Sequence, residues 1–168
     1  MLRPTARSSP RTTAIEAVTV DLPDLAATQA LGARLAVLLR RGDLVGLEGD
    51  LGVGKSELAR AVIRQLAGAD VEVPSPTFTL LQTYDMPGLA VIHADLYRLG
   101  EPGELAELGL DEALERGAVL VEWPERAGDA LPADRLTIRL GLGADRNARQ
   151  AELIAGPSWI DRLVCLRP

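Results

Sequence analysis

The sequence predicts an α/β fold, a three-layer sandwich in which helices cover both faces of a mixed, mostly parallel central sheet. Two observations lead to this class. Short apolar runs suited to buried parallel strands alternate with segments whose apolar residues recur at helical spacing. Turn-rich sequences join other strands directly, which adds antiparallel pairs to the sheet. A chain of 168 residues is long enough to build one such domain around a core of its own.

The first half of the predicted domain alternates between strand and helix. The expected elements are a strand over 15–20, a helix over 24–41, a strand over 43–48 and a helix over 56–67. Asp24 is a suitable N-cap, because its carboxylate can accept a hydrogen bond from the first helical turn. Gly42 and Gly68 stand where the two helices should end, since glycine readily adopts the left-handed conformation that closes a helix.

The second half is predicted to add two hairpins and a terminal helix. The expected strands lie over 79–84, 89–94, 118–121, 136–140 and 150–155, and the expected helices over 101–116 and 158–164. Residues 85–88 read as a four-residue turn, and Gly109 should interrupt the first of these helices. Pro74 and Pro76 should hold residues 74–78, which precede the strand over 79–84, in an extended conformation.

Composition restricts the classes of partner. The net charge of −6 argues against a broad phosphate-binding face, so any role with tRNA is expected to be indirect. Apolar runs fall well short of the roughly 20 residues that cross a bilayer, so we expect a cytoplasmic protein that makes no membrane contact. The single cysteine, Cys165, excludes an internal disulfide and is expected to be packed.

The N-terminal residues differ from the rest of the chain. Residues 1–13 contain Arg3, Arg7 and Arg11 among Ser, Thr and Pro, with no acidic residue. This composition, which lacks an apolar stripe, is typical of disorder. We therefore expect a disordered tail over 1–13 and a single domain over 14–168.

Residues 49–56 match the G-x-x-x-x-G-K-[ST] phosphate-binding motif in full. The loop consists of Gly49, Asp50, Leu51, Gly52, Val53, Gly54, Lys55 and Ser56. Its glycines let backbone N–H groups approach phosphates, the lysine reaches the terminal phosphates and the hydroxyl of Ser56 ligates Mg²⁺. Lys55 is the only lysine in the chain. The motif lies between a predicted strand and a predicted helix, as it requires, and indicates a P-loop NTPase-like protein that binds ATP or ADP with Mg²⁺.

Asp95 and Glu122 are the candidate catalytic carboxylates. Each follows an apolar strand, and such strands deliver side chains to the carboxyl edge of a sheet, where α/β folds bind ligands. One carboxylate can hold Mg²⁺, directly or through water, while the other orients or deprotonates the attacking water; spacing alone leaves the assignment open. Thr77, in a loop after the phosphate-loop helix, is a candidate switch residue that senses the γ-phosphate and Mg²⁺.

Four motifs in this order resemble the TsaE family, also called YjeE. They are Gly-Asp-Leu-Gly-Val-Gly-Lys-Ser at 49–56, Ser-Pro-Thr-Phe-Thr-Leu at 75–80, His-Ala-Asp-Leu-Tyr-Arg-Leu at 93–99 and Val-Glu-Trp-Pro-Glu at 121–125. The resemblance extends over about residues 18–155. It implies a small ATPase required for threonylcarbamoyladenosine formation on tRNA, which acts through the transferase TsaD in its complex with TsaB.

The resemblance also implies roles for particular residues. Residues 52–56 would hold the phosphates, and Ser56 and Glu122 would hold Mg²⁺. Asp95 would be the catalytic acid and Thr77 the switch hydroxyl. The remaining implied positions are Leu25 and Thr28, with Asp24, on the adenine side, Trp123 on the functional surface, and Arg146 as a late nucleotide contact. Ser56 and Val53 stand where the family usually has Thr and Ala, and both retain the chemistry of the loop.

Three other functions are alternatives to this ATPase. A signalling GTPase would need Asn-Lys-x-Asp to read guanine, and the single lysine excludes this motif. A small-molecule P-loop kinase is the stronger alternative, although such enzymes usually close an Arg-rich lid over the transferred phosphate, and the segment after Glu101 is acidic. A nucleotide-binding module without hydrolysis is the third.

Overall fold

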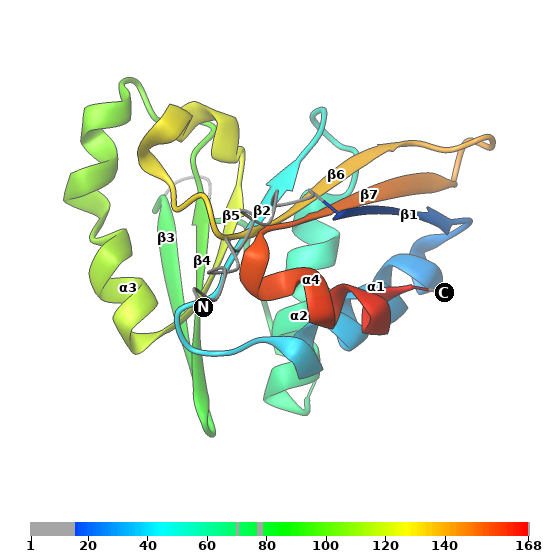
Figure 1. The fold of residues 1–168 in the computed structure, drawn as a ribbon, viewed down its shortest axis with the longest axis horizontal. Coiled ribbons are helices and arrows are strands. Elements are labelled where there is room, and N and C mark those ends of the chain that lie inside the picture. The colour runs from blue at the N-terminus through cyan, green and yellow to red at the C-terminus, as the bar shows by residue number, and fades with distance from the viewer. Residues whose placement is uncertain (1–15, 70, 77–78, 168) are drawn as a thin grey trace, which may run out of the picture.

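A computed structural model describes residues 16–69, 71–76 and 79–167 (Figure 1). The predicted tail over 1–13 and Thr77 lie outside the described residues. Within those ranges, seven strands form one sheet in the order β1-β7-β6-β2-β5-β4-β3. The strands are β1 (Glu16–Leu22), β2 (Leu44–Glu48), β3 (Leu81–Met86), β4 (Leu89–Asp95), β5 (Gly117–Glu122), β6 (Leu136–Leu142) and β7 (Arg149–Ala155).

The sheet is mixed, with parallel strands at its centre. β2 is parallel to both β5 and β6, and β4 is parallel to β5. The pairs β1–β7, β6–β7 and β3–β4 are antiparallel and lie toward the edges. The predicted α/β fold with a mixed sheet is therefore confirmed. Hairpins supply the β3–β4 and β6–β7 pairs as expected, whereas β1 and β7 are far apart in the sequence.

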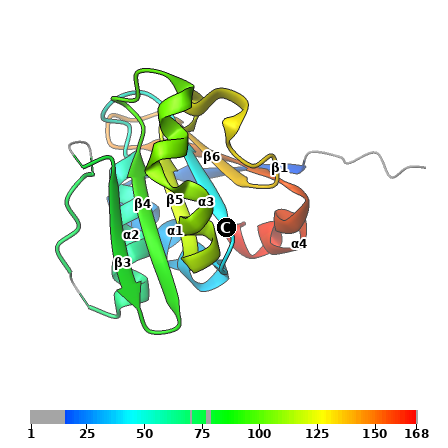
Figure 2. The same ribbon diagram turned by 90° about the vertical axis from the view of Figure 1, so that its left-hand side faces the viewer.

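Helices cover both faces of this sheet. α1 (Leu25–Leu38), α2 (Lys55–Ala67) and α4 (Ile160–Leu163) lie on one side, and α3 (Leu110–Arg116) packs on β4 and β5 from the other (Figures 1 and 2). The 3₁₀ helices are η1 (Pro102–Leu108), η2 (Pro124–Ala130), η3 (Pro157–Trp159) and η4 (Val164–Leu166). A hydrophobic core lies on each face of the sheet, and β5 contributes side chains to both. Ala118 and Leu120 pack with α1 and α2, whereas Val119 and Val121 pack with η1 and α3.

The helix boundaries follow local capping chemistry. Asp24 caps α1 as predicted, since its carboxylate accepts a hydrogen bond of 2.8 Å from the Ala27 amide. The helix ends at Leu38, earlier than the predicted Arg41. Asp43 explains this end, because its carboxylate accepts the Arg40 amide at 2.7 Å and so competes with a further helical turn. Gly68 closes α2 in the left-handed conformation, with φ of 65°.

The hairpin of β3 and β4 differs from the prediction. β3 begins at Leu81 rather than at residue 79, because Leu80 has φ of 62° and turns the chain. Asp85 and Met86 pair with Ala90 and Leu89, so only two residues form the turn instead of four.

Two further expectations meet different outcomes toward the C-terminus. The predicted break at Gly109 is confirmed, with φ of 66° between η1 and α3. The single helix predicted over 158–164 is replaced by the short sequence η3, α4 and η4. Cys165 is exposed in this last segment, so the expectation that it is packed is wrong. Among the described residues, no helix is both long and apolar enough to cross a membrane.

Candidate functional site

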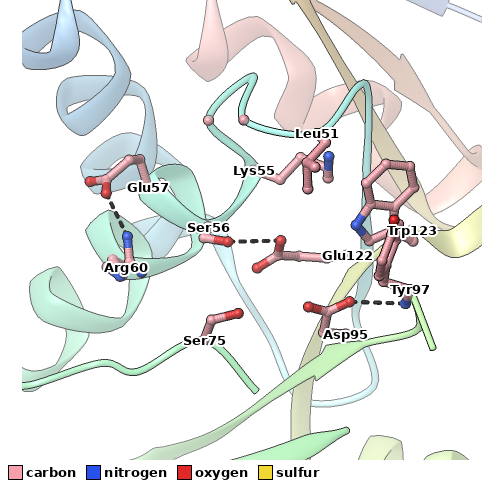
Figure 3. A pocket seen from close by; sticks show the side chains of 12 residues that line it. Leu51, Lys55, Ser56, Glu57, Arg60, Ser75, Asp95, Tyr97, Glu122 and Trp123 are labelled. Carbon is pink, nitrogen blue, oxygen red and sulfur yellow. Dashed lines mark hydrogen bonds and ion pairs between the residues drawn. The ribbon is translucent and has the colours of Figure 1, made fainter. Parts of the chain in front are cut away.

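The carboxyl ends of β2, β5 and β4 meet at one edge of the sheet. The phosphate loop follows β2, Glu122 ends β5 and Asp95 ends β4. The register pairs Asp95 with Glu122 and Glu122 with Leu47, so both candidate carboxylates lie beside the loop. A cavity of about 430 Å³ opens at this edge, lined by Leu51, Gly52, Gly54, Lys55, Ser56, Glu57, Arg60, Ser75, Asp95, Tyr97, Glu122 and Trp123 (Figure 3). We call it the phosphate cavity.

The shape of the phosphate loop depends on its glycines. Gly49 has φ of 133°, and a Cβ atom there would collide with the Leu140 carbonyl oxygen. Gly54 has φ of 117° and serves as N-cap of α2, whose first residue is Lys55. These left-handed positions let the chain turn directly from β2 into the helix, so the positive end of α2 faces the cavity.

Lys55 is almost fully buried, with 4% of its surface exposed. Its Nζ donates hydrogen bonds of 2.6 Å to the Gly49 carbonyl and 2.8 Å to the Asp50 carbonyl. Burial lowers the pKa of this ammonium, and the nearby carboxylates, Glu122 foremost, partly oppose that shift. The loop therefore holds a partly desolvated cation, which gains from an incoming anion more than an exposed lysine would.

Glu122 is held through both of its carboxylate oxygens. Oε2 accepts a hydrogen bond of 2.9 Å from the Ser56 hydroxyl, and Oε1 lies 2.7 Å from Nε2 of His93. An ionised carboxylate only accepts, so the contact requires the His93 tautomer that has its proton on Nε2 wherever Glu122 is ionised. Glu122 is 3% exposed and His93 is fully buried. His93 thus holds Oε1 of Glu122, while Oε2 lies at Ser56 on the cavity side. Such supporting hydrogen bonds are common around metal-binding carboxylates.

Asp95 is also buried, at 4% exposure, and it lies across the cavity from Ser56. Its Oδ1 accepts the Tyr97 amide at 2.9 Å, which orients the carboxylate at the end of β4 (Figure 3). Two buried carboxylates on neighbouring strands, beside one buried lysine, form the charged wall that phosphate chemistry needs.

Trp123 adopts a backbone conformation that is rare for a bulky residue. Its φ of 59° and ψ of 49° are left-handed, which costs about 1–2 kcal/mol outside glycine. The turn places its ring 3.8 Å from Nζ of Lys55, and the Tyr97 ring centroid lies 5.0 Å from that of Trp123. The two rings border the cavity next to the lysine, so the strain coincides with a cation–π contact at the site.

A second cavity of about 440 Å³ lies on the opposite side of the phosphate loop. It is lined by Asp24, Leu25, Thr28, Gly52, Val53, Gly54, Glu57, Asn147 and Arg149. We call it the α1 cavity. Leu25 and Thr28, which the resemblance assigns to the adenine side, both line it. Arg149 donates a 2.9 Å hydrogen bond from Nε to the Val53 carbonyl, which ties β7 to the loop.

Most of the predicted site residues line one of the two cavities. Residues 51, 52 and 54–56, together with Asp95, Glu122 and Trp123, line the phosphate cavity. Asp50 contributes its carbonyl to Lys55, and Val53 lines the α1 cavity. Arg146 is exposed in the loop between β6 and β7, where its carbonyl accepts Arg149 Nη1 at 3.1 Å, and it lines neither cavity.

Four further residues contribute to this region. The sequence alone leaves His93 as either packed or catalytic and Arg149 as either solvated or in contact with phosphate or a partner, and it gives Arg60 and Ser75 no role. Each of them either contacts a residue distant in sequence, as Arg149 contacts Val53, or lines a cavity. The available signals were the position of His93 beside Asp95 and of Ser75 between two prolines.

Comparison with known proteins identifies the family of this chain. A family model described as "Threonylcarbamoyl adenosine biosynthesis protein TsaE" matches residues 22–151. The chain belongs to the TsaE family. The family predicted from the four sequence motifs is thereby confirmed.

Individual relatives give the same result. A tRNA threonylcarbamoyladenosine biosynthesis protein TsaE from Rickettsia bellii is 42% identical over 115 residues, which cover 68% of this chain and 80% of that protein. A protein of the same name from Haemophilus influenzae is 33% identical over 147 residues, which cover 84% of this chain and 91% of that protein. A crystal structure of YdiB from Bacillus subtilis is similar with a TM-score of 0.75 and 27% identity, over 91% of this chain and 95% of that chain.

Proposed function

We propose that this TsaE family member is a Mg²⁺-dependent ATPase that supports threonylcarbamoyladenosine modification of tRNA in the cytoplasm. It would act through a complex with the transferase TsaD and TsaB. The observation that carries the proposal is the 2.9 Å hydrogen bond between the Ser56 hydroxyl and the Glu122 carboxylate, beside the buried Lys55. A hydroxyl, a carboxylate and an ammonium at the start of a helix are the groups that bind a metal–nucleotide complex.

The donor set suits Mg²⁺ in particular. Among the described residues, no cluster of three or more His, Cys, Asp or Glu side chains could hold a metal by itself. Mg²⁺ is usually held by one or two protein oxygens together with substrate phosphates and water, so Ser56 and Glu122 would suffice. His93 keeps Glu122 oriented at 2.7 Å. When bound, the ion supplies charge neutralisation at the phosphates.

The phosphates would be held by the loop and by Lys55. Within residues 52–56, Gly52, Gly54, Lys55 and Ser56 line the phosphate cavity at the positive end of α2, where backbone N–H groups favour an anion. The Lys55 ammonium, now on the carbonyls of Gly49 and Asp50, would exchange these bonds for phosphate oxygens. That exchange is favourable because it returns a full countercharge to a buried cation.

Asp95 would act on the attacking water. The Tyr97 amide donates to Oδ1 of Asp95 and orients the carboxylate, which lines the phosphate cavity. A carboxylate within reach of water can orient it and accept its proton as the γ-phosphate is transferred. Glu122 is the proposed Mg²⁺ ligand beside Ser56, so the role toward water is assigned to Asp95.

The nucleoside would extend into the α1 cavity. This cavity shares Gly52 and Gly54 with the phosphate cavity, so a single ligand can occupy both sides of the loop. The side chain of Leu25, which is 52% exposed, offers an apolar surface for a base. Arg146, near the C-terminal end of the sequence, remains a proposed contact to the nucleotide. It would have to reach the ligand from the loop between β6 and β7.

The charge of the chain supports an indirect role with tRNA. A net charge of −6 is unfavourable for contact with a nucleic acid backbone. A protein of this charge is better suited to bind other proteins that hold the tRNA, and its nucleotide state would then be read by those partners.

Product analysis tests the enzymatic part of this proposal. Incubation with Mg²⁺ and ATP should give ADP and free phosphate without any added acceptor. A requirement for a small-molecule acceptor, with the phosphate recovered on that acceptor, would favour the kinase. Co-purification with TsaD and TsaB in ATP, in ADP and without nucleotide tests the partner assignment, and equal or absent binding in all three would contradict it.

A further inference from the structure

Arg60 connects the helix after the phosphate loop to the extended segment that carries Ser75. It lies on α2 one turn after Ser56 and lines the phosphate cavity. Its Nε donates a hydrogen bond of 2.9 Å to the Val73 carbonyl, and its Nη1 donates to Glu57 (Figure 3). The guanidinium is therefore held on two edges by two acceptors.

A second arginine repeats this contact one turn further along. Arg64 donates from Nε to the Val71 carbonyl at 3.2 Å. Arg60 and Arg64 lie on the same face of α2, since residues four apart in a helix are neighbours. Together they hold two alternate carbonyls of residues 71–76, which we call the strap.

The strap is stiff between these contacts and Ser75. Pro74 and Pro76 fix their own φ angles, and Val73 and Ser75 each precede a proline, which restricts them to extended conformations. The Val73 side chain is buried, with 3% exposed. Because the strap is stiff, a shift of the Val73 carbonyl would also shift Ser75, so the position of Ser75 depends on where that carbonyl is held.

Ser75 forms part of the wall of the phosphate cavity. It lines this cavity together with Ser56, Asp95 and Glu122. Its hydroxyl points toward the side of the cavity where the two carboxylates lie (Figure 3). A hydroxyl on this wall can donate to a phosphate oxygen, whereas the carboxylates around it can only accept.

We propose that Arg60 is a positioning residue for ATP hydrolysis: through its bond to Val73 it fixes Ser75 in the phosphate cavity, where the Ser75 hydroxyl donates to the γ-phosphate. This inference rests on the proposed ATPase function. The geometry requires arginine rather than charge alone, because the planar fork spans Val73 and Glu57 at once and a compact lysine ammonium does not.

The test compares five variants of the full chain with the wild type. They are Arg60→Gln, Arg60→Lys, Ser75→Ala, the double variant Arg60→Gln with Ser75→Ala, and Arg34→Gln as a matched control. Arg34 on α1 also donates to a backbone carbonyl, that of Arg167 at 2.8 Å, but it does not line the phosphate cavity. The readouts are single-turnover ATP hydrolysis, ADP affinity by calorimetry, and amide hydrogen exchange of the strap without nucleotide.

Both Arg60 variants should slow hydrolysis by about 10- to 100-fold, the loss that a displacement of roughly 1 Å can cause. ADP affinity should stay within about twofold, since ADP lacks the γ-phosphate. Strap amides should exchange faster in both Arg60 variants and at the wild-type rate in Arg34→Gln. The double variant should be no slower than the slower single variant, because both changes remove the same interaction.

Three results would overturn the inference. Near-normal hydrolysis in Arg60→Lys would show that charge, not the fork, matters. Multiplied losses in the double variant would separate Arg60 from Ser75. Unchanged strap exchange in Arg60→Gln would show that the bond to Val73 does not hold the segment. A wild type that neither binds nor hydrolyses ATP would instead contradict the proposed function, while the exchange experiment, done without nucleotide, still tests the tether.

Discussion

The phosphate cavity and the α1 cavity share one loop but differ in the groups that they bury. The phosphate cavity contains Glu122 and Asp95, at 3% and 4% exposure, and both are oriented by hydrogen bonds. The α1 cavity contains no comparably buried carboxylate among the described residues, and its buried polar side chain is Thr28 at 5%. Buried carboxylates are costly, so their concentration on one side indicates where a cation and reacting phosphates belong.

This difference predicts separate roles for the two cavities, with catalysis in the phosphate cavity and nucleotide recognition in the α1 cavity. Changes in the phosphate cavity should alter catalysis and the response to Mg²⁺, whereas changes in the α1 cavity should alter the affinity for ATP and ADP alike. The loop between them should affect both.

The largest expected effect is that of Asp95→Asn. The amide keeps the shape and the bond from the Tyr97 amide but cannot accept the proton of water, so hydrolysis should slow by about 10²- to 10⁴-fold. ATP affinity should be nearly unchanged. Single-turnover hydrolysis and calorimetry measure the two quantities. Loss of binding with normal turnover of the bound fraction would exchange the roles of Asp95 and Glu122.

Lys55→Ala should weaken binding of both nucleotides by about 100-fold, the size expected for the loss of a charge-assisted hydrogen bond of roughly 3 kcal/mol. Lys55→Arg should restore little of this, because the wide guanidinium does not fit where Nζ lies between the Gly49 and Asp50 carbonyls. Calorimetric titration with Mg²⁺ and ATP is the measurement. Wild-type affinity in both variants would disprove the phosphate-loop assignment.

Glu122→Gln should mainly change the Mg²⁺ requirement. The amide removes the negative charge opposite Ser56, so the Mg²⁺ concentration for half-maximal ATP binding should rise by about tenfold. Titrating Mg²⁺ at fixed ATP measures this shift. Arg34→Gln is a suitable control, since Arg34 does not line the cavity and has no proposed role in binding nucleotide or metal. An unchanged Mg²⁺ requirement in Glu122→Gln would remove this residue from the metal site.

The smallest expected effect belongs to the α1 cavity. Arg149→Gln removes the bond to the Val53 carbonyl and should weaken ATP and ADP binding equally, by about fivefold for roughly 1 kcal/mol. The hydrolysis rate of bound ATP should not change. Arg146→Gln, measured in parallel, tests the late contact implied by the family resemblance. A selective loss of hydrolysis in Arg149→Gln would contradict the division between the two cavities.

Local chemistry explains what the sequence could predict. The phosphate loop, the cap at Asp24 and the breaks at Gly68 and Gly109 each depend on a few adjacent residues, and all are present. Asp95 and Glu122 were placed at strand ends because apolar runs end there, and the parallel pairing of β4 with β5 brings them together.

Long-range contacts explain what the sequence could not predict. The partner of His93 depends on the pairing of β4 with β5, and the bond from Arg149 to Val53 joins residues that are 96 apart. The early end of α1 depends on Asp43, whose carboxylate also receives Nη1 of Arg162 at 2.6 Å from the last helix. Such pairings follow from strand order and tertiary packing, which periodicity does not specify. Thr77 stays a prediction, because it lies outside the described residues.

Steady-state phosphate release with and without the purified TsaD–TsaB pair tests the central claim most directly. The wild-type chain, with its charged phosphate cavity and a net charge of −6, should hydrolyse Mg²⁺-ATP slowly alone and faster with the pair, and Asp95→Asn should abolish the stimulated rate. A rate that the pair never changes, with ATP consumed only when a small-molecule acceptor is added and the phosphate recovered on that acceptor, would contradict a coupled ATPase and support the kinase instead.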